Sequence, residues 1–166
     1  MERVQFADEM QFRAAAERLF AEQQTRILAV LPAADIQHVG STAVPGSLTK
    51  GDLDIQVRVA EADFEKAVEV LSELYELNDG SIQTDSFRAF QQETLPPPLG
   101  VQLTVIGSDY DFFWKFRELM LAHPHYVVLY NQLKSYFQGN DHDAYRIAKH
   151  DFFKKLIETP EFQALR

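Results

Sequence analysis

The stretch HVGSTAVPGSLTKGDLDI, residues 38–55, places two chemical features at a fixed distance along the chain. The first is Gly40-Ser41, which follows a short apolar segment, so that bare backbone and a hydroxyl group are available to a phosphate. The second is the pair Asp52 and Asp54 on the next expected strand, where side chains two residues apart share a face. Two neighbouring carboxylates stay ionised together when a cation lies between them, so the pair predicts a magnesium site beside a phosphate-binding turn.

Each feature alone is common in proteins that lack such a site. Gly-Ser closes many ordinary turns, and Asp-x-Asp is often an exposed strand face or a cap. Their order along the chain is more specific, because a strand, a turn and a second strand follow one another with ten residues between Ser41 and Asp52. This arrangement resembles the pattern of the nucleotidyltransferase superfamily, which has the polymerase-beta-like fold.

Outward from this stretch, hydrophobic periodicity predicts a small sheet with helices around it. Alternating apolar residues predict strands at residues 36–39, 53–59, 86–91 and 100–106. Helical spacing predicts helices at residues 9–31, 61–77, 111–122, 124–137 and 142–157. The expected fold class is therefore α/β (α+β), a small mixed sheet with flanking helices and a C-terminal helical cap. We divide the chain into a core over residues 1–108 and a helical extension over residues 109–166, packed as a single compact unit.

Composition excludes several classes of protein. The 166 residues are 46% hydrophobic, enough for the core of a folded domain, and the net charge of −9 makes long nucleic acid an unexpected partner. No cysteine is present, no apolar run is long enough to cross a membrane, and the histidines lack zinc-site spacing. The first residues lack the basic and apolar build of a signal peptide. We therefore expect a cytoplasmic protein with no membrane partner and no haem, flavin or zinc.

Residues 38–46, HVGSTAVPG, resemble the His-x-Gly-Ser-Thr-x-Val-Pro-Gly signature of the GrpB family, a bacterial group of small nucleotidyltransferase-like proteins. The C-terminal part is also similar to that family, in Phe116-Arg117-Glu118-Leu119, His123-Pro124, Tyr130-x-x-Leu133-Lys134 and Tyr145-x-x-x-Lys149. The resemblance runs from about residue 8 to residue 157. It implies a nucleotidyltransferase-type fold with a helical C-terminal extension.

One strand departs from the pattern of active nucleotidyltransferases, which carry a third carboxylate on a strand next to the Asp pair. Here that strand contains Gln102 and Thr104, which alternation places on the site-facing side. The GrpB family generally resembles His-Leu-His at these positions, so the chain differs from both patterns. Gln and Thr bind water or a sugar hydroxyl, but neither is a general base near neutral pH.

Four further residues are candidates for the site. Arg88 would either bind a phosphate from the sheet face opposite its aromatic neighbours or lie solvated on the strand. Lys134 and Lys149 match family positions on helices expected to cap the site, and each would either bind phosphate or be an ordinary surface lysine. His38 would either contact the site or be hydrogen-bonded beneath the turn.

The favoured function is magnesium-dependent binding of a nucleoside triphosphate or a related phosphorylated small molecule, extended to nucleotidyl transfer to a small acceptor. In that hypothesis Asp52 and Asp54 are the catalytic, metal-binding residues, and Gly40 and Ser41 hold the phosphates. The missing third acid favours an alternative, a catalytically silent module that binds a nucleotide or phosphorylated metabolite and regulates a protein partner that the sequence does not identify. A scaffold without a ligand is a third reading.

Overall fold

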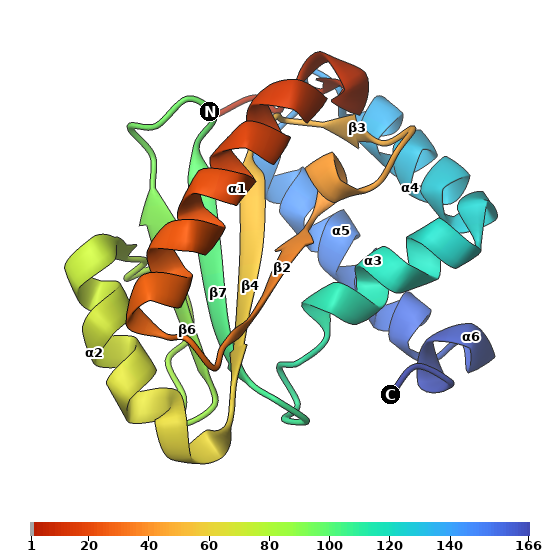
Figure 1. Ribbon diagram of the computed structural model, residues 1–166. Helices are drawn as coiled ribbons and strands as arrows, with labels where there is room; N and C mark the ends of the chain where they lie inside the picture. The colour runs from red at the N-terminus through yellow and green to blue at the C-terminus, as the bar shows by residue number, and fades with distance from the viewer. Residues whose placement is uncertain (1) are drawn as a thin grey trace.

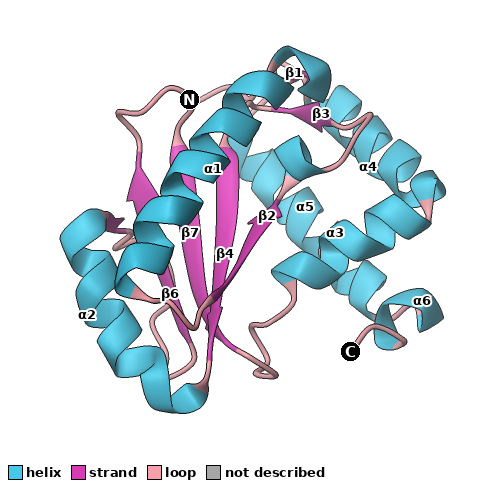
Figure 2. Ribbon diagram, in the orientation of Figure 1, coloured by secondary structure: helices cyan, strands magenta, loops and turns pink. Residues whose placement is uncertain are grey.

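The computed structural model describes residues 2–166 and contains a five-stranded mixed sheet. In spatial order its strands are β2 (Asp35–Val39), β4 (Leu53–Val59), β7 (Leu99–Val105), β6 (Phe87–Gln92) and β5 (Glu76–Leu77). Strands β4 and β7 run parallel, whereas the other neighbouring pairs are antiparallel. Figures 1 and 2 show β4 inside the sheet, between β2 and β7.

The helices form two groups. On one face of the sheet lie α1 (Arg13–Val30) and α2 (Phe64–Leu74), and beyond β2 lie α3 (Phe113–Ala122), α4 (Pro124–Phe137), α5 (His142–Ile157) and the short α6 (Pro160–Gln163) (Figure 1). A separate antiparallel pair joins β1 (Ala7–Asp8) to β3 (Leu48–Thr49). The small mixed sheet with flanking helices and a C-terminal helical cap is therefore confirmed. Within residues 2–166, no helix is both long and apolar enough to cross a membrane.

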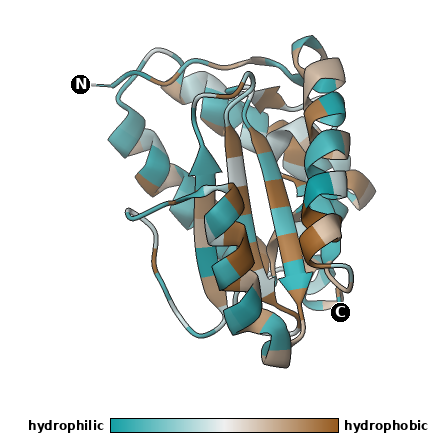
Figure 3. Cartoon of the chain, turned by 60° about the vertical axis from the view of Figure 1, so that its left-hand side comes forward, coloured by the Kyte–Doolittle hydropathy of each residue, from teal (hydrophilic) through white to brown (hydrophobic). Residues whose placement is uncertain are grey.

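Strand β4 separates an apolar layer from a polar one, because its side chains alternate between the two faces of the sheet. Leu53, Ile55 and Val57 have no exposed surface and join the main core with residues of α1 and α2. Figure 3 shows the same alternation of hydrophobic and hydrophilic residues along the strands. The opposite face of β4 carries Asp54, Gln56 and Arg58, so this polar side of the sheet is the one that holds chemically active groups.

A second core lies among the C-terminal helices. Its buried members are Val44, Leu119, Met120, Tyr126, Val127, Tyr130, Leu156 and Phe162. Val44 comes from the turn that follows β2, so the Gly-Ser turn is anchored in the helical core. The division of the chain at residue 108 stays a prediction, although it falls in the connection between β7 and α3.

Three of the expected helices have different bounds, and the one expected over residues 111–122 begins at Phe113. The one expected over residues 9–31 begins as a short 3-10 turn, η1 (Glu9–Gln11), and becomes α-helical at Arg13. The one expected over residues 61–77 is preceded by a similar turn, η3 (Glu61–Asp63), and ends at Leu74. Tyr75 then takes an extended conformation because its ring is buried, and its hydroxyl donates a hydrogen bond to Gln23 Oε1. The next two residues pair with β6 as the edge strand β5.

The N-terminal segment is fastened to the loop between α4 and α5. The Val4 backbone N–H donates to the Asn140 carbonyl at 3.1 Å, and the Gly139 N–H donates to the Val4 carbonyl at 2.8 Å. The His142 N–H also donates to the Glu2 carbonyl at 2.9 Å. These bonds join residues more than 130 positions apart, so the helical cap is tied to the start of the described chain.

Asp111 ties the connection between β7 and α3 to the polar face of the sheet. Its buried carboxylate accepts two hydrogen bonds of 2.7 Å from Arg58 and bonds of 2.9 Å from Gln56 Nε2 and the Gly107 N–H. Arg58 also donates to Asp35 of β2 at 2.7 Å. Burial acts to raise the pKa of Asp111, but the hydrogen bonds from Arg58, Gly107 and Gln56 outweigh it and leave the pKa below its ordinary value.

We expect Asp111→Ala to lower the free energy of unfolding by about 3–5 kcal/mol at neutral pH, because it leaves the half-buried Arg58 charge without its main partner. The pKa of Asp111 is lower in the folded state, so its stabilisation is present at neutral pH and lost as the pH falls through the folded-state pKa. Urea titrations at neutral and acidic pH measure both effects. Asp109→Asn, at a nearby exposed acid, is the control and should stay within about 0.5 kcal/mol of the wild type. Equal losses in the two variants would contradict the assignment.

Candidate functional site

The Asp54 carboxylate lies between the bare backbones of two glycines. A Cβ atom added at Gly40 would overlap Asp54 Oδ2, and one added at Gly100 would lie 3.0 Å from Asp54 Oδ1. Gly40 also has a φ of 77°, a conformation that side-chain-bearing residues rarely adopt. Glycine at both positions therefore leaves room for a carboxylate on the polar face of β4.

The turn after β2 is held by its own side chains and by the strand beside it. It contains the 3-10 turn η2 (Ser41–Ala43), and the buried Ser47 hydroxyl makes hydrogen bonds to the carbonyls of Val44, at 2.6 Å, and Ser41, at 3.1 Å. The Thr42 hydroxyl donates to the Asp52 carbonyl at 3.2 Å. The turn and the start of β4 are thus fixed relative to each other.

A cavity of about 1190 Å³ opens between this turn, the polar face of the sheet and helices α3, α4 and α5. Its polar lining at the sheet consists of Gly40, Ser41, Ser47, Asp54 and Gln102. Its apolar lining includes Val39, Val44, Phe112, Phe113, Phe116, Met120, Tyr130, Ile147, Phe153 and Ile157. The cavity therefore has a polar end and an apolar wall, which suits a ligand that has both kinds of surface.

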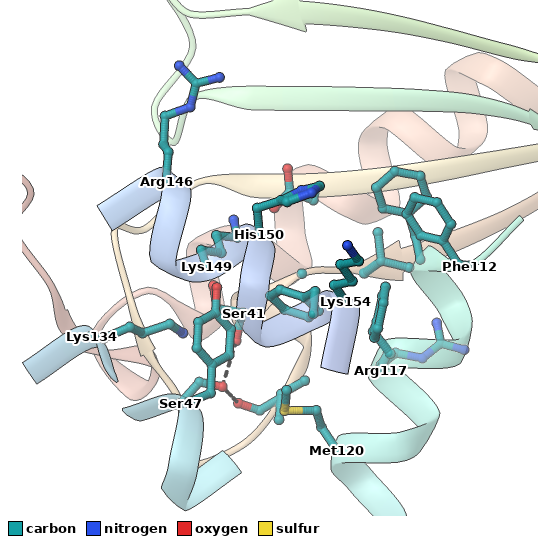
Figure 4. A pocket seen from close by; sticks show the side chains of 18 of the residues that line it. Ser41, Ser47, Phe112, Arg117, Met120, Lys134, Arg146, Lys149, His150 and Lys154 are labelled. Carbon is teal, nitrogen blue, oxygen red and sulfur yellow. Dashed lines mark hydrogen bonds between the residues drawn. The ribbon is translucent and has the colours of Figure 1, made fainter. Parts of the chain in front are cut away.

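Basic side chains are concentrated in the cavity although the protein as a whole is acidic. The basic lining residues are Arg117, Lys134, Arg146, Lys149, His150 and Lys154, against the acids Asp54, Asp143 and Asp151. Figure 4 shows Lys134 and Lys149 pointing from α4 and α5 toward the end of the cavity that contains Ser41. Arg117 is already engaged, because it donates to Gln37 Oε1 and to the His38 carbonyl.

Burial raises the pKa of Asp54 to about 6. The positive charge of Lys149 opposes this shift, the negative charge of Asp52 adds to it, and Lys50 opposes it again. The carboxylate is therefore mostly ionised at neutral pH, but its charge is held at a cost in stability. A cation beside it would remove that cost.

Asp52 precedes β4 and is half-buried, and it does not line the cavity. Its negative charge helps to raise the pKa of Asp54. Of the two carboxylates expected to act together, Asp54 alone lines the cavity. Within residues 2–166, no three His, Cys, Asp or Glu side chains form a group that would hold a metal ion. Asp52 and Asp54 are therefore not part of a larger group of candidate metal ligands in the described residues.

Of the two residues expected to face the site from β7, Gln102 lies in the cavity wall and Thr104 does not. Thr104 points to the same face but is fully buried, and its hydroxyl accepts a hydrogen bond of 2.9 Å from Gln56 Nε2. The expectation that Thr104 faces the site was wrong, because Gln56 and the connection around Asp111 cover it. Gln102 lies beside Gly100, where an added Cβ would lie 3.2 Å from Gln102 Nε2 and 3.0 Å from Asp54 Oδ1.

Arg88 lies on the wrong face of the sheet for the role considered above. It pairs with Leu103, whose side chain belongs to the main core, and its guanidinium lies 5.8 Å from the ring centroid of Phe64 at the start of α2. It donates a hydrogen bond to the Thr84 carbonyl at 3.3 Å. The phosphate role for Arg88 was therefore wrong, as was the placing of Phe90 opposite to it, since residues 88 and 90 share a face.

His38 supports the turn from beneath, on the α1 side of the sheet. Its ring stacks on Phe20 at 5.3 Å, and its Nε2 lies 3.0 Å from Thr42 Oγ1. Burial, helped by the charge of Arg117, lowers the pKa of His38 to about 4, so the ring is neutral at neutral pH. Of the two roles considered for His38, the geometry places it under the turn and outside the cavity lining.

Sequence reasoning missed most of the wall that α5 contributes. Arg146 was expected as a cation for an anionic ligand, but His150, Phe153, Lys154 and Ile157 of the same helix, which also line the cavity, were not. The signal was present as a helix face on which basic and then apolar residues recur at intervals of three and four. The aromatic residues of α3 were expected to pack between sheet and helices, and the structure adds that Phe112, Phe113 and Phe116 also line the cavity.

Three comparisons place the chain among known proteins. The family model described as GrpB protein matches residues 10–159. A Vibrio cholerae protein of the UPF0157 group is 31% identical over 155 residues, which cover 93% of this chain and 82% of that protein. The crystal structure of GrpB from Enterococcus faecalis superposes with a TM-score of 0.73 at 19% identity, covering 95% of this chain and 97% of that one. The Cid1 poly(U) polymerase bound to MgGTP gives a TM-score of 0.42 at 12% identity, over 71% of this chain and 42% of that one.

Asp54→Asn should raise the free energy of unfolding by about 0.5–2 kcal/mol at neutral pH in metal-free buffer, because it removes a charge held in a half-buried place. The pKa of Asp54 is higher in the folded state, so the cost of its charge is absent where the group is neutral in both states. It grows as the pH rises from the ordinary Asp value to about 6. The difference in the free energy of unfolding between the variant and the wild type should therefore be small in acid and reach its full value above about pH 6.

Urea titrations over this pH range measure the effect. Glu73→Gln, at an exposed acid on α2, is the control and should show no such trend. If Asp54→Asn is less stable than the wild type at every pH, the carboxylate is a structural hydrogen-bond acceptor.

Proposed function

The chain belongs to the GrpB family, and from this premise and the geometry of the cavity we propose that it binds a magnesium-complexed nucleoside triphosphate or a related phosphorylated small molecule. One observation carries the proposal. Basic side chains from the C-terminal helices face Asp54 across the Gly40-Ser41 turn, although the protein carries a net charge of −9. Local cations in an acidic protein favour a specific anionic ligand over general electrostatic attraction.

The phosphates would occupy the end of the cavity at the Gly-Ser turn. Gly40 leaves its backbone open there, the Ser41 hydroxyl is at the cavity surface, and Lys149 supplies a positive charge from α5. Charge-assisted hydrogen bonds from such groups are stronger than neutral ones. Arg146 lies further along the same helix, where it would contact the outer part of a polyphosphate.

Magnesium fits the donor set if the ligand brings oxygen atoms of its own. The ion is usually bound by one or two carboxylates together with substrate phosphates and water. Asp54 would be the direct ligand and Asp52 the supporting charge, and the lack of a three-ligand group in residues 2–166 agrees with an ion that arrives with its phosphates. When bound, the ion would neutralise phosphate charge and remove the cost of ionised Asp54.

The apolar wall would take the remainder of the ligand. Phe112, Phe113 and Phe116 of the α3 region and Phe153 of α5 offer ring faces, and Met120 adds a flexible apolar surface. Nucleobases stack on aromatic side chains without regard to their hydrogen-bonding edges. The apolar wall of the cavity therefore supports binding of a nucleobase or another flat ring.

Binding without chemical transfer is the form of this function that the site supports best. Gln102 occupies the part of β7 beside Asp54 where a third carboxylate would act, and a glutamine does not remove a proton from an attacking hydroxyl. His38 is outside the cavity and hydrogen-bonded to Thr42. The silent binding module is thus favoured over nucleotidyl transfer to a small acceptor.

We expect ATP with magnesium to raise the free energy of unfolding by about 2.7 kcal/mol at a concentration 100 times its dissociation constant, and ATP with excess chelator to have a much smaller effect. Thermal-shift measurements over a set of nucleotides test this. Lys149→Gln should weaken binding about tenfold, whereas Lys155→Gln, an exposed lysine on the same helix outside the cavity, should leave it unchanged. Equal shifts in magnesium and in chelator would refute the metal role, and no shift with any nucleotide would refute the ligand class.

A radiolabel assay separates binding from transfer. We expect the wild-type protein to retain labelled nucleotide without passing it to small hydroxyl-bearing acceptors. Gln102→Asp would place a carboxylate beside Asp54, and we expect slow transfer above the wild-type level. Gln102→Asn has the same size without the charge and is the matched control. Transfer by the wild-type protein itself would show that binding alone is not the function.

A further inference from the structure

The cavity wall holds a buried lysine that the phosphate site does not need. Lys134, on α4, is 1% exposed, its Nζ donates a hydrogen bond to the Leu48 carbonyl, and Nζ lies 3.8 Å from the ring centroid of Tyr130. Within residues 2–166, no acidic side chain forms an ion pair with it. A neutral carbonyl and an aromatic ring compensate an ammonium charge only in part, so this amine is poorly stabilised in its charged form.

The charges around Lys134 also disfavour the protonated form of its amine. Burial, together with the positive charges of Lys149 and Lys50, lowers its pKa to about 7. The Tyr130 hydroxyl lies 3.1 Å from that of Tyr145, and burial keeps the pKa of both above the ordinary value, so neither supplies a counterion. A substantial share of the Lys134 amine is therefore unprotonated at neutral pH, unlike a surface lysine.

We propose that Lys134 is a nucleophilic site that forms an imine with an aldehyde carrying a phosphate group. Desolvated lysines next to other cations are the type that react with carbonyl compounds. The phosphate of such a ligand would bind at Ser41 and Lys149, which lie at the same end of the cavity as the Lys134 amine (Figure 4). The apolar wall would take a ring or chain.

The reaction balances without an oxidant or a reductant. The lone pair of Lys134 Nζ attacks the carbonyl carbon, and a carbon–nitrogen bond forms as the carbonyl electrons move to oxygen. The two protons of the neutral amine leave with that oxygen as water, and a carbon–nitrogen double bond remains. The site goes beyond the proposed nucleotide function, because it depends on the amine and on the phosphate end of the cavity and not on magnesium.

Pyridoxal 5′-phosphate is a suitable probe, since it has an aldehyde, a phosphate and a flat ring. The wild-type protein would be incubated with it at neutral pH, reduced with borohydride to fix any imine, and mapped by peptide mass spectrometry. We expect one pyridoxyl group per chain, on Lys134, at probe concentrations that leave the exposed Lys66 and Lys155 unlabelled. Label spread over surface lysines, or absent from the Lys134 peptide, would overturn the proposal. This arm needs no variant and so does not depend on the folding of one.

Variants and competitors separate this site from the nucleotide site. Lys134→Met keeps an unbranched side chain only one atom shorter and should abolish labelling, whereas Lys155→Met should leave it unchanged. Pyridoxal, which lacks the phosphate, should label about tenfold more slowly, and equal rates would overturn the phosphate requirement. Protection by ATP would support both proposals. Labelling of Lys134 that no nucleotide slows would keep this site and refute the nucleotide site.

Discussion

Strand β4 pairs along both edges and alternates strictly between an apolar face and a polar face, and most of the molecule follows from that constraint. The apolar face of Leu53, Ile55 and Val57 requires α1 and α2 as a cover. The polar face cannot be covered in the same way, because each buried polar group there needs a partner. At one end of the strand, Asp111 and the backbone of Trp114 supply hydrogen-bond partners, and at the other end the C-terminal helices enclose a cavity.

The polar face is accordingly divided along the length of the strand. At one end Gln56 and Arg58 are bonded to Asp111, and Thr104 is sealed beneath them. At the other end Asp54 lies between two glycines and faces the cavity. The hydrogen bonds at the Asp111 end fix α3 relative to the sheet. They thereby set the spacing between α3 and the sheet at the Asp54 end, where the cavity lies. In this GrpB-family protein the candidate site is thus the part of the polar face that the fold leaves open to the cavity.

The local pattern was enough to predict the fold and to bring Gly40, Ser41 and Asp54 to one cavity. Gly40, Ser41 and Asp54 meet because a strand, a tight turn and a second strand follow directly in the chain. Arg88 was misplaced because residues 87 and 90 differ by an odd number and lie on opposite faces. The register between β6 and β7 decides which face of the sheet Arg88 lies on, and that register is a long-range property. Thr104 has the face that alternation predicts, but it is covered by Gln56 of β4, which is distant in the sequence and is itself bonded to Asp111.

The bonds between residues 2–4 and residues 139–142 have a consequence for how the chain is made. The N-terminal segment leaves the ribosome early and has no partner until the loop after α4 has been synthesised. All residues of the sheet and of its first helices have been synthesised once Val105 is reached, so these elements are able to form before the hydrogen bonds to the N-terminal segment do. These hydrogen bonds join residues that are far apart in the sequence, and such contacts form late because of their entropic cost. A nascent chain would therefore carry a formed sheet with an open polar face, and the walls of the cavity would assemble last.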